Sequence, residues 1–126
     1  MIDKQYIYGC ILWHAIEGYH DSYLDFAKEL AEDYTIEDIA GGIISWKWID
    51  KDTIFFFEAK DQFQEKGEWA FKVLKAMKDI TEREGVKFLQ ISTRSEKVKR
   101  VMARKGFKLK EETQTAKPVY VLVKEV

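Results

Sequence analysis

Several kinds of residue are scarce in this chain of 126 residues, and each scarcity argues against a class of protein. The single cysteine, Cys10, cannot form a disulfide within the chain, which favours a reducing, cytoplasmic environment. One proline and seven glycines argue against linkers and disorder. No apolar run is long enough to cross a bilayer, and the first residues lack a signal-peptide pattern. The length predicts a single domain over residues 1–126.

The net charge is close to zero, but it differs sharply between the two halves of the chain. Residues 1–63 hold 5 basic and 13 acidic residues, a net charge of −8, and residues 64–126 hold 16 and 9, a net charge of +7. The densest basic run, Arg94–Lys110, has eight Lys or Arg residues opposed by Glu96. A solvated surface, a cofactor phosphate or a nucleic acid would each explain it. Nucleic acid is the least favoured, because no base-stacking aromatics are interleaved with this run.

The N-terminal third predicts a strand followed by a helix. Lys4–Trp13 alternates two sets of apolar side chains, as a strand does. A helix over residues 21–34 would begin at Asp21-Ser22, with Asp25 completing a capping box.

No metal site is predicted in this part of the chain. His14 and His20 flank Glu17, but their spacing does not place two histidines on one helical face. Cys10 has no recognisable partner and is expected to be a buried small residue.

The middle of the chain predicts a hairpin and then a long helix. Ile43–Ile49 and Thr53–Ala59 both have strand patterns and are joined by a tight connection, so they are expected to pair as antiparallel strands. Trp46 and Trp48 share one face of the first strand, where a core position is favoured over an acceptor groove. The helix over 66–84 places four apolar residues on one face and ends at a glycine suited to a left-handed cap: Trp69, Val73, Met77, Ile80 and Gly85.

The C-terminal part predicts a strand, a helix and a second hairpin. Val86–Ser92 is the strand, and Ser95–Lys105 is the helix, with Val98, Val101 and Met102 on its inner face. Phe107–Glu111 and Val119–Lys124 form the hairpin. The strands before and after the long helix are expected to be parallel neighbours, because a helical crossover joins them. The predicted fold class is therefore α/β (α+β), with about six mostly antiparallel strands and three helices.

The order of elements over residues 41–126 resembles the GNAT acyltransferase superfamily. The most specific signals are the loop Gln64–Trp69 and the stretch RVMARKGFK at Arg100–Lys108. The superfamily's pyrophosphate loop has Arg or Gln, two residues, Gly, one residue, and then Gly or Ala. Gln64 and Gly67 fit this pattern, whereas Trp69 stands where a small residue is expected. The chain also looks like compact GNAT-related proteins of tailed bacteriophages, which would place it in the host cell or the virion.

The resemblance implies an N-acyltransferase that takes an acyl group from acetyl-CoA and passes it to an amine of unknown identity. Glu58 is the implied catalytic base, and its apolar neighbours would move its ionisation toward neutral pH. Met102 stands where the family often has a tyrosine and cannot protonate the leaving thiolate. The implied cofactor contacts run from the central strand through the loop to the last helix: Ala59, Asp61, Gln64, Glu65, Lys66, Gly67, Glu68, Trp69 and Ser95.

The orientation of Trp69 decides whether the loop can hold a pyrophosphate. If the ring packs inward with Val73 and Met77, the N–H groups of Lys66–Glu68 stay open to an anion, and the helical period favours this choice. A ring turned outward would occupy the anion site. A catalytically silent GNAT-fold protein that binds another protein is the alternative, since the loop is altered and the N-terminal part is short.

Overall fold

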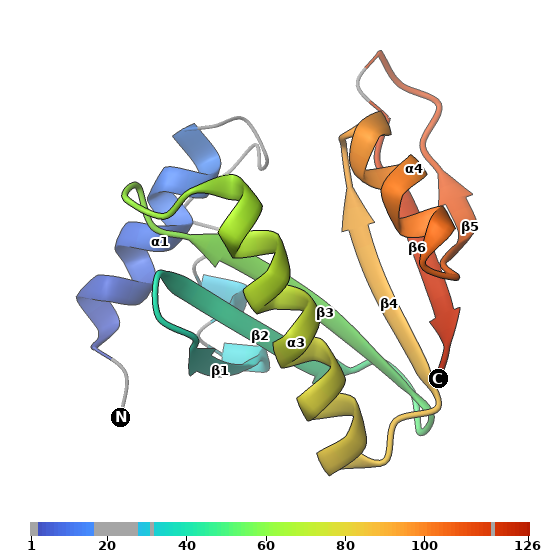
Figure 1. Cartoon of the computed structure of the whole chain (residues 1–126), viewed down its shortest axis with the longest axis horizontal. Helices are drawn as coiled ribbons and strands as arrows, with labels where there is room; N and C mark the ends of the chain where they lie inside the picture. Colours follow the sequence, from blue (N-terminus) through green and yellow to red (C-terminus); the bar gives the residue numbers. More distant parts are fainter. Residues whose placement is uncertain (1–2, 17–27, 31, 117) are drawn as a thin grey trace.

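The chain folds into a six-stranded sheet with helices on both faces (Figure 1). A computed structural model describes residues 3–16, 28–30, 32–116 and 118–126. The helices are α1 (Lys4–Ile16), α3 (Lys66–Glu84) and α4 (Glu96–Arg104). The strand order is β1-β2-β3-β4-β6-β5, with these bounds: β1 Thr35–Asp38, β2 Gly42–Trp48, β3 Thr53–Lys60, β4 Phe88–Thr93, β5 Lys108–Glu112 and β6 Tyr120–Glu125. Every neighbouring pair is antiparallel except β3 and β4, which confirms the predicted fold class.

The first element is a helix, so the predicted strand Lys4–Trp13 is wrong. The segment is apolar on nearly every side, and such a run fits a buried helix as well as a strand. In the structure α1 packs Cys10 and Ile11 against Ile43 and Ala59 of the sheet. The sheet gains its sixth strand from β1 instead, which the sequence reading did not identify.

The predicted helix over 21–34 can be compared with the structure at its C-terminal end alone. Residues 28–30 and 32–33 are helical, and Leu30 is buried. The predicted cap at Asp21-Ser22, the capping-box residue Asp25, and also Glu17 and His20, lie outside the described residues.

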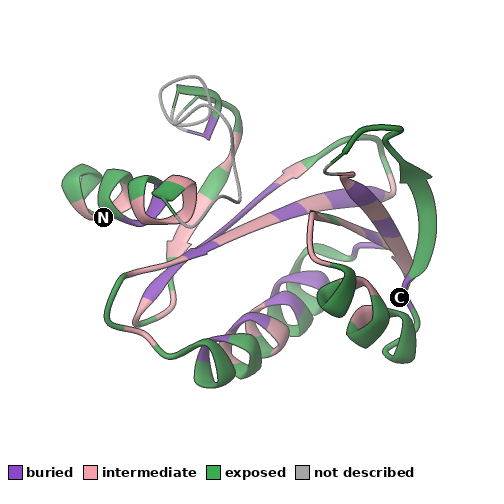
Figure 2. Cartoon of the chain, turned by 90° about the horizontal axis from the view of Figure 1, so that it is seen from above, coloured by how far each residue is buried: buried purple, intermediate pink, exposed green. Residues whose placement is uncertain are grey.

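The predicted first hairpin is confirmed and supplies the second and third strands of the sheet. β2 and β3 pair from Gly42↔Lys60 to Trp48↔Ile54. Alternation along these strands sends Ile44, Trp46 and Phe56 into a core with α3 and α4, and sends Ile43 and Ala59 into a core with α1. Figure 2 shows α1 on one side of the sheet and the other two helices on the opposite side.

The long helix α3 matches its prediction closely. Its buried residues include the predicted stripe of Trp69, Val73, Met77 and Ile80, each of which contributes about 1.5–3 kcal/mol when fully buried. Gly85 adopts φ 66°, the left-handed cap that glycine takes without strain, and its N–H donates to the Thr81 carbonyl. The crossover returns the chain into β4 beside β3, as the parallel pairing predicted.

The shorter helix α4 differs from its prediction on two of three inner positions. Met102 packs against the core, whereas Val98 and Val101 are 40% and 38% exposed. Lys99 lies on the side of α4 that faces β6, and its ammonium is 4.1 Å from the Tyr120 ring centroid.

Gly42 gives the first test of this packing. A Cβ at Gly42 would lie 2.5 Å from the Ala59 carbonyl oxygen and 2.7 Å from Lys60 Cα, and it would overlap the Trp69 ring. We expect Gly42→Ala to lower the free energy of unfolding, measured in urea, by about 1–3 kcal/mol. Gly9→Ala is the control, because a Cβ there meets nothing within 4 Å, and it should raise stability by up to about 1 kcal/mol. Equal effects of the two changes would contradict the packing.

Candidate functional site

The sheet opens between β3 and β4. The ladder joins Thr53–Phe55 to Phe88–Gln90, and beyond these residues the two strands diverge (Figure 1). β4 continues to pair with β6 as far as Thr93↔Tyr120, and β3 continues to pair with β2 as far as Lys60. Where β3 and β4 diverge, each strand therefore stays hydrogen-bonded to its other neighbour.

The register shows which backbone groups point toward the diverging side. The Asp61 N–H donates to the Gly41 carbonyl, and the Ile49 N–H donates to the Thr53 carbonyl. Because hydrogen-bonded and non-hydrogen-bonded pairs alternate in an antiparallel ladder, the odd-numbered residues of β3 direct their N–H and C=O groups to β2. Those of Phe56, Glu58 and Lys60 are directed toward β4.

The predicted cofactor contacts Ala59 and Asp61 lie on the other parity of β3. The Asp61 N–H donates to the Gly41 carbonyl within the sheet, and the Ala59 side chain is fully buried against α1. The backbone groups directed to the diverging side belong to the even-numbered residues, Glu58 and Lys60 among them. This parity follows from the hairpin register, which the sequence gives no direct means of reading. Contact of Ala59 and Asp61 with a cofactor stays a prediction.

The start of α3 presents backbone donors beside this divergence. Glu65 is the N-cap residue and makes no side-chain capping bond. The Trp69 N–H closes the first turn by donating to the Glu65 carbonyl. The N–H groups of Lys66, Gly67 and Glu68 precede it and have no acceptor within the helix, which gives this end a partial positive charge.

Trp69 turns inward, the orientation that the helical period favoured. Its side chain is 5% exposed and packs in the core with Val73 and Met77. Gly67 is exposed, and a Cβ there would meet nothing within 4 Å. Ala70, one position late in the sequence pattern, follows Gly67 by three residues and so lies on the same side of the helix. The exposed side of the first turn thus carries small residues despite the tryptophan.

A carboxylate organises the loop that leads into α3. Asp61 Oδ1 accepts the N–H groups of Phe63 and Gln64, both at 2.9 Å, and Oδ2 accepts the Tyr6 hydroxyl at 3.1 Å. Burial and the neighbouring Cys10 and Asp61 raise the pKa of the Tyr6 phenol, so it remains a donor over the physiological range. The helix α1 is thereby tied to the loop, a link that sequence analysis missed.

Gln64, the first residue of the loop motif, is held by the protein itself. Its Oε1 accepts the Lys72 ammonium at 2.7 Å, and its Nε2 donates to Glu68 at 3.2 Å. Lys72 also donates to the Ala40 carbonyl at 2.6 Å. These contacts fix the loop against the turn that precedes β2.

The hollow in front of this loop is acidic. It has a volume of about 340 Å³ and is lined by Gly41, Asp61, Phe63, Gln64, Glu65 and Glu68. Three of the six residues carry carboxylates, which disfavour an anion, whereas the helix start favours one. Two ammonium groups at its edge offset part of this charge, since Lys72 donates to Gln64 and Lys60 donates to the Asp61 carbonyl.

Glu58 lies beneath the first turn of α3. Its Oε2 accepts the indole N–H of Trp69. A donated hydrogen bond favours the ionised carboxylate, which opposes the effect of apolar neighbours on which the sequence argument relied. Glu58 is thus placed as a carboxylate held by a rigid donor.

The predicted contact at the start of the last helix has a structural role in the protein. Ser95 is the N-cap of α4, and its hydroxyl accepts the Val98 N–H at 3.1 Å. Its own N–H donates to the Thr93 hydroxyl at 3.1 Å. The contact of Ser95 with a cofactor stays a prediction.

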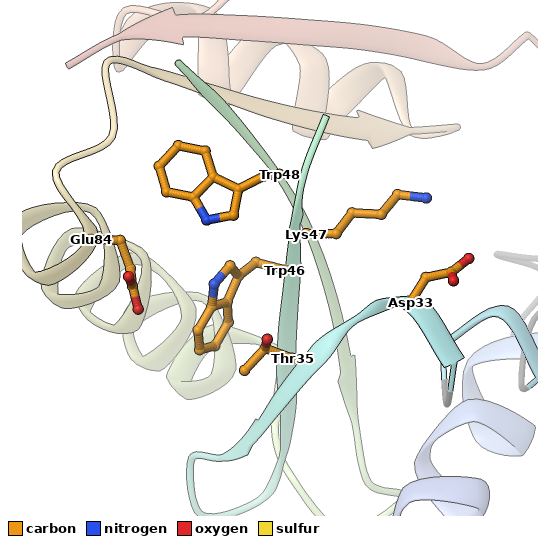
Figure 3. Close-up of a pocket in the computed structure, with 6 residues that line it drawn as sticks. All are labelled: Asp33, Thr35, Trp46, Lys47, Trp48 and Glu84. Atoms are coloured by element: carbon orange, nitrogen blue, oxygen red, sulfur yellow. The ribbon is translucent and has the colours of Figure 1, made fainter. Parts of the chain in front are cut away.

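The second hollow, of about 540 Å³, lies at the other end of α3 (Figure 3). Trp46, Trp48 and Glu84 lie on one side of β2 there, and Lys47 and Asp33 lie on the other. Trp46 is buried, as the core interpretation expected, and Trp48 is 44% exposed. A helix of 19 residues is about 28 Å long, so this hollow is remote from the helix start.

Two further residues that the sequence singled out, Cys10 and His14, pack against other parts of the protein. Cys10 is buried, as expected, and burial raises the pKa of its thiol to about 11. The ring of His14 lies 4.8 Å from that of Phe57 in an edge-to-face contact. Within the described ranges no three His, Cys, Asp or Glu side chains are grouped as metal ligands. No helix in the same ranges is long and apolar enough to span a membrane.

Comparison with known proteins identifies the fold. No family model matches the sequence, and no curated protein matches it. Among solved structures, Ard1 from Thermoplasma volcanium is similar over 99% of this chain and 94% of its own, with a TM-score of 0.71 and 13% identity. An IAA acetyltransferase from Bacillus cereus is similar over 99% and 96%, with a TM-score of 0.69 and 15% identity. A GNAT family acetyltransferase from Elizabethkingia anophelis, with acetyl-CoA bound, is similar over 81% and 82%, with a TM-score of 0.62 and 16% identity.

These likenesses show that the chain has the GNAT fold. The sequence identities are low, so the fold is what the comparison establishes. Within this fold the chain pairs β3 with β4 in parallel after a helical crossover, as the sequence predicted.

The Asp61 cluster predicts a measurable contribution to stability. Asp61→Ala removes an acceptor of three hydrogen bonds, so we expect it to lower the free energy of unfolding in urea by about 1.5–3 kcal/mol. Tyr6→Phe removes one of them and should cost about 1 kcal/mol. Asp3→Ala is the control, because the Asp3 carboxylate accepts an exposed N–H from Gln5. A loss no larger for Asp61→Ala than for Asp3→Ala would contradict the assignment.

Proposed function

We propose that this chain is an acyl-CoA-dependent N-acyltransferase, with acetyl as the simplest acyl group and an amine as acceptor. The divergence of β3 from β4 beside the start of α3 carries the proposal. An extended amide chain such as pantetheine would bond to the backbone groups of Glu58 and Lys60 and to the Phe56 carbonyl, which point toward the divergence beyond the last β3–β4 pair. A pyrophosphate would lie against the N–H groups of Lys66–Glu68, the kind of place where helices bind anions.

The residues present fit such a donor in two further respects. Gly67 has open space in front of it, so a phosphate can approach the backbone. Val98 and Val101 expose apolar surface on α4, beside which an alkyl chain would be shielded from water. GNAT-fold structures with acetyl-CoA bound, such as the Elizabethkingia anophelis protein, support the choice of donor.

The chemistry would be a direct transfer. The neutral amine attacks the thioester carbonyl, the C–N bond forms as the C–S bond breaks, and the proton leaving the nitrogen passes to Glu58. Met102 has no proton to give, so the thiolate takes its proton from solvent water. The loss of a positioned general acid costs roughly a hundredfold in rate, which is compatible with a slow enzyme.

A catalytically silent protein that binds another protein is the second candidate. The acidic lining of the hollow at the helix start, with Asp61, Glu65 and Glu68, favours it, because these carboxylates oppose a pyrophosphate. The two candidates differ in one property, the binding of acyl-CoA.

Calorimetric titration with acetyl-CoA and with CoA tests the proposal. We expect binding at concentrations below millimolar by the unaltered protein. Gly67→Val should abolish it, because the added side chain projects into open space where the phosphate must approach, with no clash that would unfold the protein. Gly9→Val is the matched control, since it makes the same change at another open helical glycine.

Two results would decide against the enzyme. No heat with either ligand near millimolar concentration would favour the silent binding protein. Equal binding by the unaltered protein and Gly67→Val would show that any CoA site lies elsewhere.

A further inference from the structure

The side chain of Trp69 connects three elements at the proposed site. It leaves the first turn of α3, donates its indole N–H to Glu58 on β3, and ends over Gly42 on β2. It is 5% exposed, so the hydrogen bond is shielded from water. An indole nitrogen can donate but not accept, which fixes the direction of the bond.

The position of the ring is set by packing as well as by the hydrogen bond. The ring belongs to the core with Ile44, Phe56 and Val73, and any side chain at Gly42 would overlap it. A buried aromatic ring held in this way has little rotational freedom. The donor that meets Glu58 is therefore as rigid as the core that surrounds it.

We propose that Trp69 is a positioning residue that holds the Glu58 carboxylate ionised and in one orientation for proton transfer. The hydrogen bond engages Oε2, and the carboxylate so held would take up the proton from the amine nitrogen while the C–N bond forms. This inference rests on the proposed function. It also gives a physical reason for a tryptophan at a position where a small residue would suffice to admit a phosphate.

The inference predicts different effects for two changes in the pair. Trp69→Phe keeps a ring in the core but removes the N–H, so the carboxylate loses its donor. Glu58→Gln keeps an acceptor for the indole but removes the base. Trp48→Phe is the matched control, because Trp48 is a half-exposed tryptophan on β2 at the far end of α3.

Acetyl-CoA binding is first measured by calorimetry. Thiol release from acetyl-CoA is then measured between pH 5.5 and 9, with water alone and with two probe amines, spermidine and an alanine-initiated peptide. We expect Trp69→Phe to lower kcat about tenfold and Glu58→Gln about a hundredfold, since a positioned base contributes roughly 100- to 10,000-fold. KM for acetyl-CoA should stay within about twofold, because neither change removes a cofactor contact. The acidic limb of the pH profile should move to higher pH in Trp69→Phe, because the ionised carboxylate has lost a donor. Trp48→Phe should change none of these.

The outcomes separate this inference from the proposed function. No acetyl-CoA binding by the unaltered protein overturns both. Binding without thiol release in any of the reactions overturns the catalytic role of Glu58, and the positioning role with it, and leaves a cofactor-binding protein. Binding and turnover with an unchanged kcat and pH profile in Trp69→Phe overturn the positioning role alone.

A spectroscopic measurement keeps the test decisive if Trp69→Phe does not fold. The indole N–H signals of the tryptophans are resolved by two-dimensional 1H–15N NMR of the unaltered protein, of Glu58→Gln and of Trp48→Phe. We expect one indole signal to titrate with pH in the unaltered protein and to lose that titration in Glu58→Gln. An indole spectrum insensitive to both pH and Glu58→Gln would overturn the inference.

Discussion

The parallel pairing of β3 and β4 is the constraint on which the rest of the structure depends. A helical crossover must join two parallel neighbours, so α3 is obliged to start where β3 ends and to lie across the sheet. The ladder holds the strands together at Thr53–Phe55, and the outer partners β2 and β6 hold them apart farther on. One arrangement thereby sets strand backbone and helix start around the same divergence.

The large side chain at the start of α3, that of Trp69, packs inside the protein and not at its surface. Trp69 replaces a small residue, and Gly42 provides the space for its ring. A tryptophan at this position costs little folding free energy, because its ring packs in the core and its N–H donates to the Glu58 carboxylate. The exposed side of the helix start keeps Gly67 and Ala70. An altered loop motif and an open helix start are therefore compatible in this protein.

Local patterns predicted the parts of the fold that local forces determine. The α3 stripe, its Gly85 cap and the β2–β3 hairpin follow from periodicity and turn chemistry, and the structure confirms them. The first helix was misread because an apolar run has no period to detect. Val98 and Val101 were misplaced because helical spacing shows which residues share a face but not what covers that face. The candidate site was predicted as a set of neighbours in sequence. Its contacts from Tyr6 to Asp61 and from Trp69 to Glu58 join distant segments, which one sequence cannot pair.

Backbone hydrogen exchange tests the central claim most directly, namely that the diverging side of β3 receives an extended amide ligand. The register directs the amides of Glu58 and Lys60 toward that side, and directs the Ala59 amide to β2. With acetyl-CoA added, the account predicts slower exchange of the Glu58 and Lys60 amides and unchanged exchange at Ala59. Unchanged exchange at all three amides, at acetyl-CoA concentrations up to millimolar, would contradict it.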